Sequence, residues 1–124
     1  MPQLLVDSSV WIAYFYGPDI AAKNIIDSEN ELFVSVISLF EIRRKLLRMG
    51  VRRQTLEKVL SFVRYRGRVI DVNRVTADTA ADVSVRHNLS TADALIYSTA
   101  VERKLELVTG DSDFTKLNNV RVLK

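Results

Sequence analysis

The sequence predicts an α/β fold with a mostly parallel central sheet of four to five strands and helices on both faces. Three observations favour this class. Short apolar runs alternate along the chain with longer segments whose apolar residues recur at helical spacing. The runs are apolar throughout, which is typical of parallel strands buried on both faces. At 124 residues and 48% apolar composition, the chain is expected to form one domain, residues 1–124, with its own core.

The first third of the chain predicts one strand and two helices. Residues 4–6 form a buried strand, and the Asp-Ser-Ser that follows is a helix start signal. This helix continues to Tyr16, and Gly17-Pro18 ends it. Residues 19–29 have apolar side chains at helical spacing and predict a second helix.

The middle of the chain predicts a strand and then a helical hairpin. Residues 32–36 form the second strand, and residues 38–49 form an amphipathic helix with Gly50 at its C-terminal cap. Residues 52–65 form the second helix of the hairpin. The hairpin carries more apolar side chains than one sheet face needs. These are Phe40, Leu46, Leu47, Phe62 and Tyr65.

The last third predicts the remaining strands and two more helices. Residues 68–72 form the third strand, and residues 76–87 and 91–104 form helices separated by a short polar break. Residues 105–108 form the fourth strand and residues 120–123 a short fifth one. Strands that alternate with helices in this way indicate parallel pairing.

Basic residues are concentrated in one part of the chain. Residues 43–74 contain eleven of the eighteen Lys and Arg residues but only two of the fifteen acids. A basic block beside an acidic remainder suggests a polyanionic partner, although solvated helix faces would give the same pattern. The chain has no cysteine and no apolar run of membrane-spanning length, so we expect a cytoplasmic protein that does not enter a membrane.

Four carboxylates lie where apolar strands end or where helices begin. They are Asp7, Glu41, Asp93 and Asp111, with Asp113 two residues behind the last. The carboxyl ends of parallel strands share one edge of a sheet, so these acids are expected to converge in the crevice there. They would repel one another unless a divalent cation lay between them. An all-oxygen set of ligands suits Mg²⁺ or Mn²⁺.

Each acid also has a purely structural interpretation. Asp7 is a suitable N-cap residue, and Ser38 with Glu41 matches a capping box. Asp93 would complement the dipole of a first helical turn, and the Asp111 segment would be an Asp-rich turn. These interpretations leave unexplained why the acids have apolar or small neighbours, since a charge with such neighbours tends to be partly buried and needs a partner.

Four segments resemble the acidic motifs of the PIN domain, the nuclease fold of the VapC-type toxins of prokaryotic toxin–antitoxin pairs. In chain order they are LVDSSVWI (residues 5–12), SVISLFEI (35–42), LSTADALI (89–96) and LVTGDSDF (107–114). The resemblance spans the whole chain, with the motifs in the order and spacing of the family. It implies a PIN-like three-layer sandwich.

The resemblance also implies a function. The chain would be a Mg²⁺- or Mn²⁺-dependent endoribonuclease acting as the toxin of a VapBC-type pair. Its metal-site acids would be Asp7, Glu41, Asp93 and Asp111, with Asp113 as a variable fifth, and Ser9 and Thr109 would be supporting polar residues. The partners implied are an RNA substrate, a cognate antitoxin and a second copy in a homodimer, the last two on the helical hairpin. In the basic block, Arg43, Arg44 and Arg48 are the candidates for binding RNA phosphates.

Three other functions fit parts of the sequence. A housekeeping RNA-processing PIN nuclease would have the same site, and a degenerate PIN domain could bind RNA without cleaving it. A receiver-type phospho-acceptor domain also gathers acids at strand ends. It would need an acid pair after the first strand, where this chain has Asp7 followed by serines.

Overall fold

The computed structural model describes residues 2–123 and consists of a parallel sheet between two layers of helices. The strands are β1 (Gln3–Val6), β2 (Glu31–Ser35), β3 (Gly67–Ile70), β4 (Glu106–Thr109) and β5 (Val120–Val122). Their order in the sheet is β3-β2-β1-β4-β5, and each neighbouring pair is parallel. The predicted α/β class and the predicted parallel sheet are confirmed.

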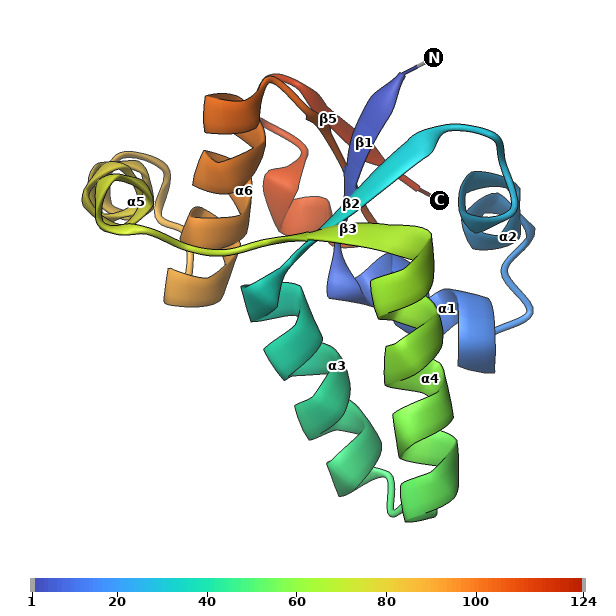
Figure 1. The fold of residues 1–124 in the computed structure, drawn as a ribbon. Helices are drawn as coiled ribbons and strands as arrows, with labels where there is room; N and C mark the ends of the chain where they lie inside the picture. Colours follow the sequence, from blue (N-terminus) through green and yellow to red (C-terminus); the bar gives the residue numbers. More distant parts are fainter. Residues whose placement is uncertain (1, 124) are drawn as a thin grey trace.

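Helices cover both faces of this sheet (Figure 1). The helices are α1 (Ser8–Tyr16), α2 (Ile20–Ile26), α3 (Val36–Arg48), α4 (Arg53–Arg66), α5 (Arg74–His87) and α6 (Thr91–Arg103), with a short 3₁₀ turn at Ser112–Phe114. Leu4 and Val6 of β1 pack with α1 to α4, whereas Leu5 between them packs with α5 and α6. Alternate residues of one continuous apolar strand therefore fill two separate cores.

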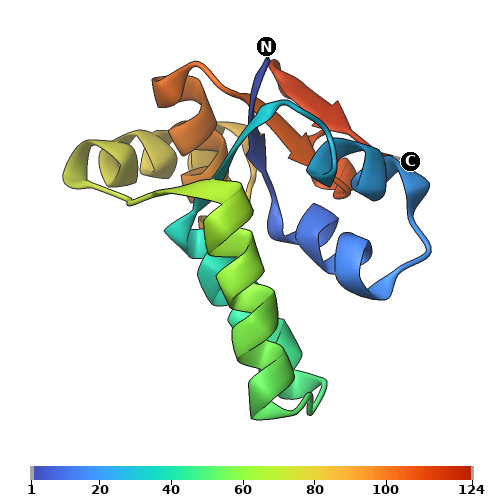
Figure 2. The same ribbon diagram turned by 45° about the vertical axis from the view of Figure 1, so that its right-hand side comes forward.

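The α3–α4 hairpin extends beyond the sheet in the direction of the strands' carboxyl ends (Figures 1 and 2). Its tip is closed by Gly50, whose φ is +73°. The Gly50 N–H donates to the Leu47 carbonyl and the Val51 N–H to the Leu46 carbonyl. This is the hydrogen-bond pattern of a Schellman cap, and it confirms the predicted glycine stop.

Two expected helix boundaries were wrong. The helix expected over residues 19–29 ends at Ile26, because the carbonyls of Ile26, Ser28 and Asn30 accept hydrogen bonds from the Arg66 guanidinium. The helix expected to begin at Ser38 begins at Val36, because the Ser35 hydroxyl accepts from the Ile37 N–H and caps it. The other elements differ from expectation by one or two residues at their ends.

Candidate metal centre

Two of the candidate acids lie at the point where the strand order of the sheet reverses. The chain proceeds from β1 outward to β2 and β3, and then returns to place β4 on the other side of β1. Asp7 directly follows β1, and Asp111 lies two residues beyond the end of β4. In open α/β sheets this switch point is where ligands bind.

Asp7 is held by two hydroxyl groups and has one carboxylate oxygen without a partner. Its side chain is 4% exposed. The Ser9 and Thr109 hydroxyls donate to Oδ2 at 2.9 and 2.8 Å, whereas the buried Oδ1 has no hydrogen-bond partner among residues 2–123. The Asp7 side chain does not cap α1, so the structural interpretation of this residue was wrong. A buried carboxylate oxygen without a partner is costly and favours a cation beside it.

The hydroxyls that hold Asp7 also fix the loop after β4. The Gly110 N–H donates to the Ser9 hydroxyl at 2.9 Å, and the Asp111 N–H donates to the Thr109 hydroxyl at 3.0 Å. One short network therefore sets the positions of Asp7 and of the backbone of Asp111 relative to each other. These hydrogen bonds are compatible with the supporting role that the resemblance implied for Ser9 and Thr109, which stays a prediction.

Glu41 projects from α3 and is bound by a residue of α1. The Ser8 hydroxyl donates to Oε1 of Glu41 at 3.0 Å. Burial raises the pKa of Glu41, and the charges of Asp7 and Asp93 raise it further, although Ser8 and Arg44 act in the opposite direction. The capping box expected between Ser38 and Glu41 was wrong, since Ser38 lies inside the helix and is buried.

Asp93 lies in the first turn of α6 and faces the other acids. Burial, and then the charges of Asp111 and Asp7, raise its pKa to about 6. The helix itself is capped by Ser90, whose hydroxyl accepts from the Asp93 N–H at 3.2 Å. The carboxylate is therefore not required as the cap, and its position costs free energy as long as it is ionised without a partner.

The tightest group of carboxylates is Asp93, Asp111 and Asp113, which each offer an oxygen within 4.8 Å of the others. Asp113, expected as a variable fifth acid, therefore lies close enough to Asp93 and Asp111 to share one ion with them. Within residues 2–123, none of the five carboxylates forms an ion pair with a Lys, Arg or His side chain. Five acids without a basic partner, one of them with an unpartnered buried oxygen, fit a divalent cation.

A basic groove leads away from Glu41 between α1 and α3. Its volume is about 530 Å³, and Glu41 lies at one end of it beside Ser8 and Ser9. The rest of its lining includes Tyr16 and three basic residues of α3, which we call the groove cations. These are Arg44, Lys45 and Arg48.

Arg43, expected with Arg44 and Arg48 as a phosphate-binding residue, lies apart from the groove. Its Nη2 is 3.4 Å from Oε2 of Glu57 on α4. Lys45 lines the groove instead, and it was not among the phosphate-binding residues expected from the sequence. The i, i+4, i+7 spacing of Glu41, Lys45 and Arg48 on one helix face could have indicated it. The contact between Ser8 and Glu41 joins residues 33 positions apart, so no local pattern could have shown it.

Comparison with known proteins gives one family. The PIN domain family model matches residues 4–120. Ribonuclease VapC6 of Methanocaldococcus jannaschii is 23% identical over an alignment 147 positions long, which covers 98% of this chain and 96% of that protein. Within residues 2–123, no helix has the length and apolar content needed to cross a membrane.

Solved structures share the fold. A toxin–antitoxin complex from Klebsiella pneumoniae contains a chain that is 23% identical, with a TM-score of 0.80 and 96% of each chain covered. The VapC20 toxin of Mycobacterium tuberculosis, described as cleaving the sarcin–ricin loop, is 23% identical, with a TM-score of 0.76, 93% of this chain and 95% of that chain covered. VapBC2 of Rickettsia felis, bound to a promoter DNA fragment, contains a chain that is 15% identical, with a TM-score of 0.79, 98% of this chain and 99% of that chain covered.

Proposed function

Because the chain belongs to the PIN domain family, we propose that it is a divalent-cation-dependent endoribonuclease that acts as the toxin of a toxin–antitoxin pair. The observation that carries this proposal is the unpartnered Oδ1 of buried Asp7 at the switch point, among acids that have no basic partner. Asp7, Glu41, Asp93 and Asp111 would hold Mg²⁺ or Mn²⁺, and Asp113 lies within reach of the same ion.

The residues around the site have different roles in the proposed reaction. A divalent cation, when bound, makes a water molecule more acidic and neutralises charge on a phosphate. Ser9 and Thr109 keep Asp7 in one orientation by binding Oδ2, which leaves Oδ1 for the ion. Ser8 similarly restricts Glu41. Asp93 must lose its proton to bind a cation, and its raised pKa makes that step dependent on pH near 6.

RNA is the proposed substrate, and the basic groove is its proposed path. The groove cations begin one helical turn beyond Glu41 on the same side of α3. They can therefore bind phosphates on one side of the bond that is cut, which is the sequence-independent contact that supplies most nucleic-acid affinity. The names of the ribonuclease and toxin relatives support RNA as the substrate class.

A cognate antitoxin is the proposed protein partner. Glu41 at one end of the groove and the groove cations along it offer complementary sites to a peptide with a basic side chain followed by acidic ones. Similar chains occur in toxin–antitoxin complexes, which supports the proposal. Co-expression with the protein of a neighbouring reading frame should yield a complex with reduced nuclease activity. If the co-expressed chain instead purifies alone and is fully active, the proposed partner is wrong.

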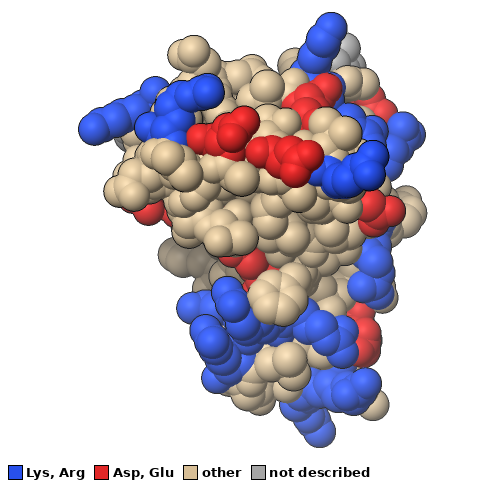
Figure 3. Space-filling model, turned by 90° about the vertical axis from the view of Figure 1, so that its left-hand side faces the viewer, with Lys and Arg blue, Asp and Glu red and all other residues tan. Residues whose placement is uncertain are grey.

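The resemblance implied a homodimer contact on the helical hairpin, but we propose that a second copy of the chain covers the face that carries α5 instead. A hollow of about 470 Å³ between α5 and α6 is lined mostly by small apolar residues, and Val85 at its rim is 87% exposed. The upper part of this face has acidic side chains flanked by basic ones, and its lower part has a dense basic group (Figure 3). Two-fold symmetry can place the acidic part of one copy near the basic part of the other. Val85→Glu should convert a dimer to a monomer in light scattering.

RNA cleavage by the purified protein tests the proposed activity. Mixed single-stranded and structured RNAs are incubated with Mg²⁺, with Mn²⁺ or with EDTA, beside the variants Asp7→Asn, Glu41→Gln, Asp93→Asn and Asp111→Asn. We expect cleavage with either metal and losses of orders of magnitude in the rate of each variant. Asp113→Asn should lose less. Unchanged cleavage by Asp7→Asn would refute the assignment of the site.

A further inference from the structure

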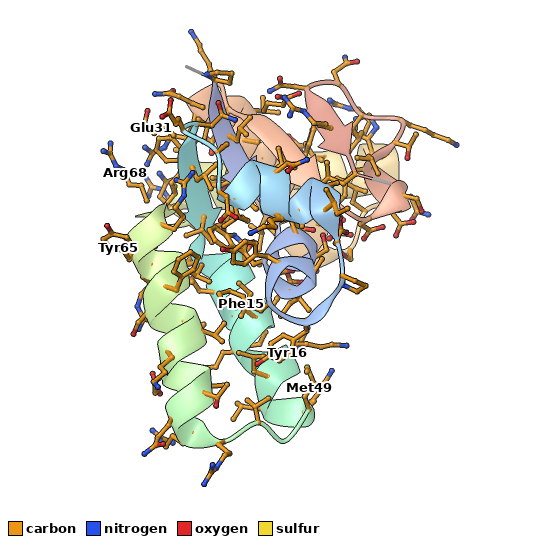
Figure 4. All side chains as sticks on the ribbon, turned by 90° about the vertical axis from the view of Figure 1, so that its right-hand side faces the viewer. Phe15, Tyr16, Glu31, Met49, Tyr65 and Arg68 are labelled. Atoms are coloured by element: carbon orange, nitrogen blue, oxygen red, sulfur yellow. The ribbon has the colours of Figure 1, made fainter. Side chains whose placement is uncertain are left out.

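Tyr65 is an aromatic side chain that does not contribute to the packing of the core. It is the penultimate residue of α4 and is 87% exposed. Within residues 2–123, its ring has no aromatic partner and its hydroxyl has no hydrogen bond, whereas Tyr14, Phe15 and Phe62 pack on one another through one stacked and two edge-to-face contacts. Figure 4 shows Tyr65 at the edge of the molecule, on the same side as Arg68 and Glu31.

Arginines surround Tyr65 in a shallow hollow of about 360 Å³, lined by Glu31, Leu32 and residues 64–68. The Arg66 guanidinium is fixed by three backbone carbonyls at 2.7 to 3.2 Å. Arg64 and Arg68 are exposed, and the only ion pair of Arg68 in the described part of the chain is with Glu31, at 3.6 Å with 72% of the Arg68 side chain exposed. An exposed pair of this length is weak. The Arg68 guanidinium also lies over the Phe33 ring, 5.7 Å from its centroid, but this contact does not use its N–H donors. The N–H groups of Arg64 and Arg68 are therefore available to a ligand.

The hollow is separate from the acidic centre and from its groove. It lies at the amino ends of β2 and β3, whereas the candidate metal ligands lie at the carboxyl ends of the strands. Strands of four or five residues put roughly 15 Å between these two edges of the sheet. Because β3 is the end strand of the sheet formed by residues 2–123, its outer edge also presents backbone N–H and carbonyl groups that no other strand of this sheet binds.

We propose that this hollow is a second RNA-binding site, at which one base of a single-stranded segment stacks on Tyr65 while Arg64 and Arg68 bind the adjoining phosphates. An aromatic face between cations is the combination that binds single strands without reading their sequence. The site would hold a part of the substrate distant from the bond that is cut. The choice of RNA rests on the proposed function, and Glu31, beside Arg68, would limit its affinity.

The proposal is tested by measuring RNA binding with the Asp7→Asn variant, which should not cleave the RNA during the titration. Fluorescein-labelled single-stranded RNA of 20 nucleotides is titrated with the full chain carrying Asp7→Asn, and anisotropy gives Kd. Adding Tyr65→Leu should weaken binding roughly tenfold, whereas Tyr65→Phe keeps the ring and should change little. Glu31→Gln, which removes the only acid of the hollow, should strengthen binding. All these side chains are at the surface, so each variant should melt at the same temperature as its parent.

The salt dependence of binding separates phosphate contact from other effects. Replacing Arg64 and Arg68 by Gln should lower the slope of log K against log salt by roughly 1.4, which corresponds to two phosphate contacts on a single strand. Equal Kd values for Tyr65→Leu and Tyr65→Phe, or an unchanged slope, would overturn the proposal.

Cleavage of a hexanucleotide too short to reach the hollow separates this proposal from the proposed function. Its rate should be the same with and without Tyr65→Leu in the otherwise wild-type chain. A chain that cleaves no RNA would refute the nuclease activity, while the binding measurements would still decide the second site. A Tyr65→Leu chain that cleaves the hexanucleotide more slowly would contradict the separation of the two sites.

Discussion

Asp93→Asn should stabilise the metal-free protein, because it removes a charge that the fold holds close to other negative charges. The substitution keeps the shape of the side chain. It also keeps the N-cap, since the Ser90 hydroxyl accepts a hydrogen bond from the backbone N–H of residue 93. The change therefore removes the negative charge of Asp93 with little effect on the helix.

The magnitude follows from the pKa of Asp93, which the folded protein raises from 3.8 to about 6. At 1.36 kcal/mol per unit, this difference corresponds to at most about 3 kcal/mol of destabilisation at pH 7. Asp93 is partly exposed, so solvent screening reduces the figure to about 1–2 kcal/mol. For a domain of this length that is roughly 4–8 °C in Tm.

The gain in stability should depend on pH with a defined sign. Because the folded state binds the Asp93 proton more tightly than the unfolded state, the penalty is absent below pH 3.8, grows between 3.8 and about 6, and is complete above that. Asp93→Asn should therefore melt higher than wild type at pH 7 in EDTA, and the difference should shrink toward zero by about pH 4.

Thermal unfolding followed by circular dichroism measures this effect. Asp82→Asn, which neutralises an exposed acid of α5, is the matched control and should change Tm little. Saturating Mn²⁺ should stabilise wild type by mass action and the Asp93→Asn variant much less. If Asp93→Asn melts lower than wild type at pH 7 in EDTA and responds equally to Mn²⁺, Asp93 stabilises the helix and is not a ligand.

Three further predictions concern the groove, the orientation of Glu41 and the hairpin. Replacing the three groove cations by Gln should lower the slope of log K against log salt for single-stranded RNA by roughly 2. Arg43→Gln, whose guanidinium faces Glu57, should leave this slope unchanged. Equal effects of the two changes would show that RNA does not bind along the groove. Ser8→Ala should weaken Mn²⁺ binding in calorimetry roughly tenfold, because it frees Glu41; an unchanged Kd would show that Ser8 has no such role. Gly50→Ala places a side chain at a φ of +73° and should cost about 1 kcal/mol in urea unfolding; a stabilised variant would contradict the strain.

The parallel sheet and the general place of the acids could be predicted from the sequence because both depend on local pattern. Continuous apolar runs predict strands buried on both faces, and Asp7 directly follows one of them. Parallel strands bring such positions to one edge whatever the details of the loops. The same reasoning placed Asp111 beyond β4, beside β1.

The environment of Glu41 could not be predicted from local pattern. Ser38 and Glu41 have the spacing of a capping box, but Ser35, paired with Ile70 of β3, is where β2 ends and where the helix is capped. Tertiary pairing therefore sets the start of α3, and Glu41 then lies beside Ser8. The side of α3 that carries the cations is likewise set by Ile42 and Leu46, which point into the core and direct Lys45 to the groove and Arg43 to α4.

Cation binding by Asp7 and its neighbours is tested most directly by measuring Mn²⁺ affinity and Mn²⁺-activated RNA cleavage on the same preparation. Calorimetry gives the Mn²⁺ Kd, and the cleavage rate is measured over the same range of free Mn²⁺. We predict that half-saturation and half-maximal rate fall at the same concentration in wild type, and that Asp7→Asn loses both. Full cleavage in EDTA, or an Asp7→Asn variant that binds Mn²⁺ as tightly as wild type, would contradict the proposed metal centre.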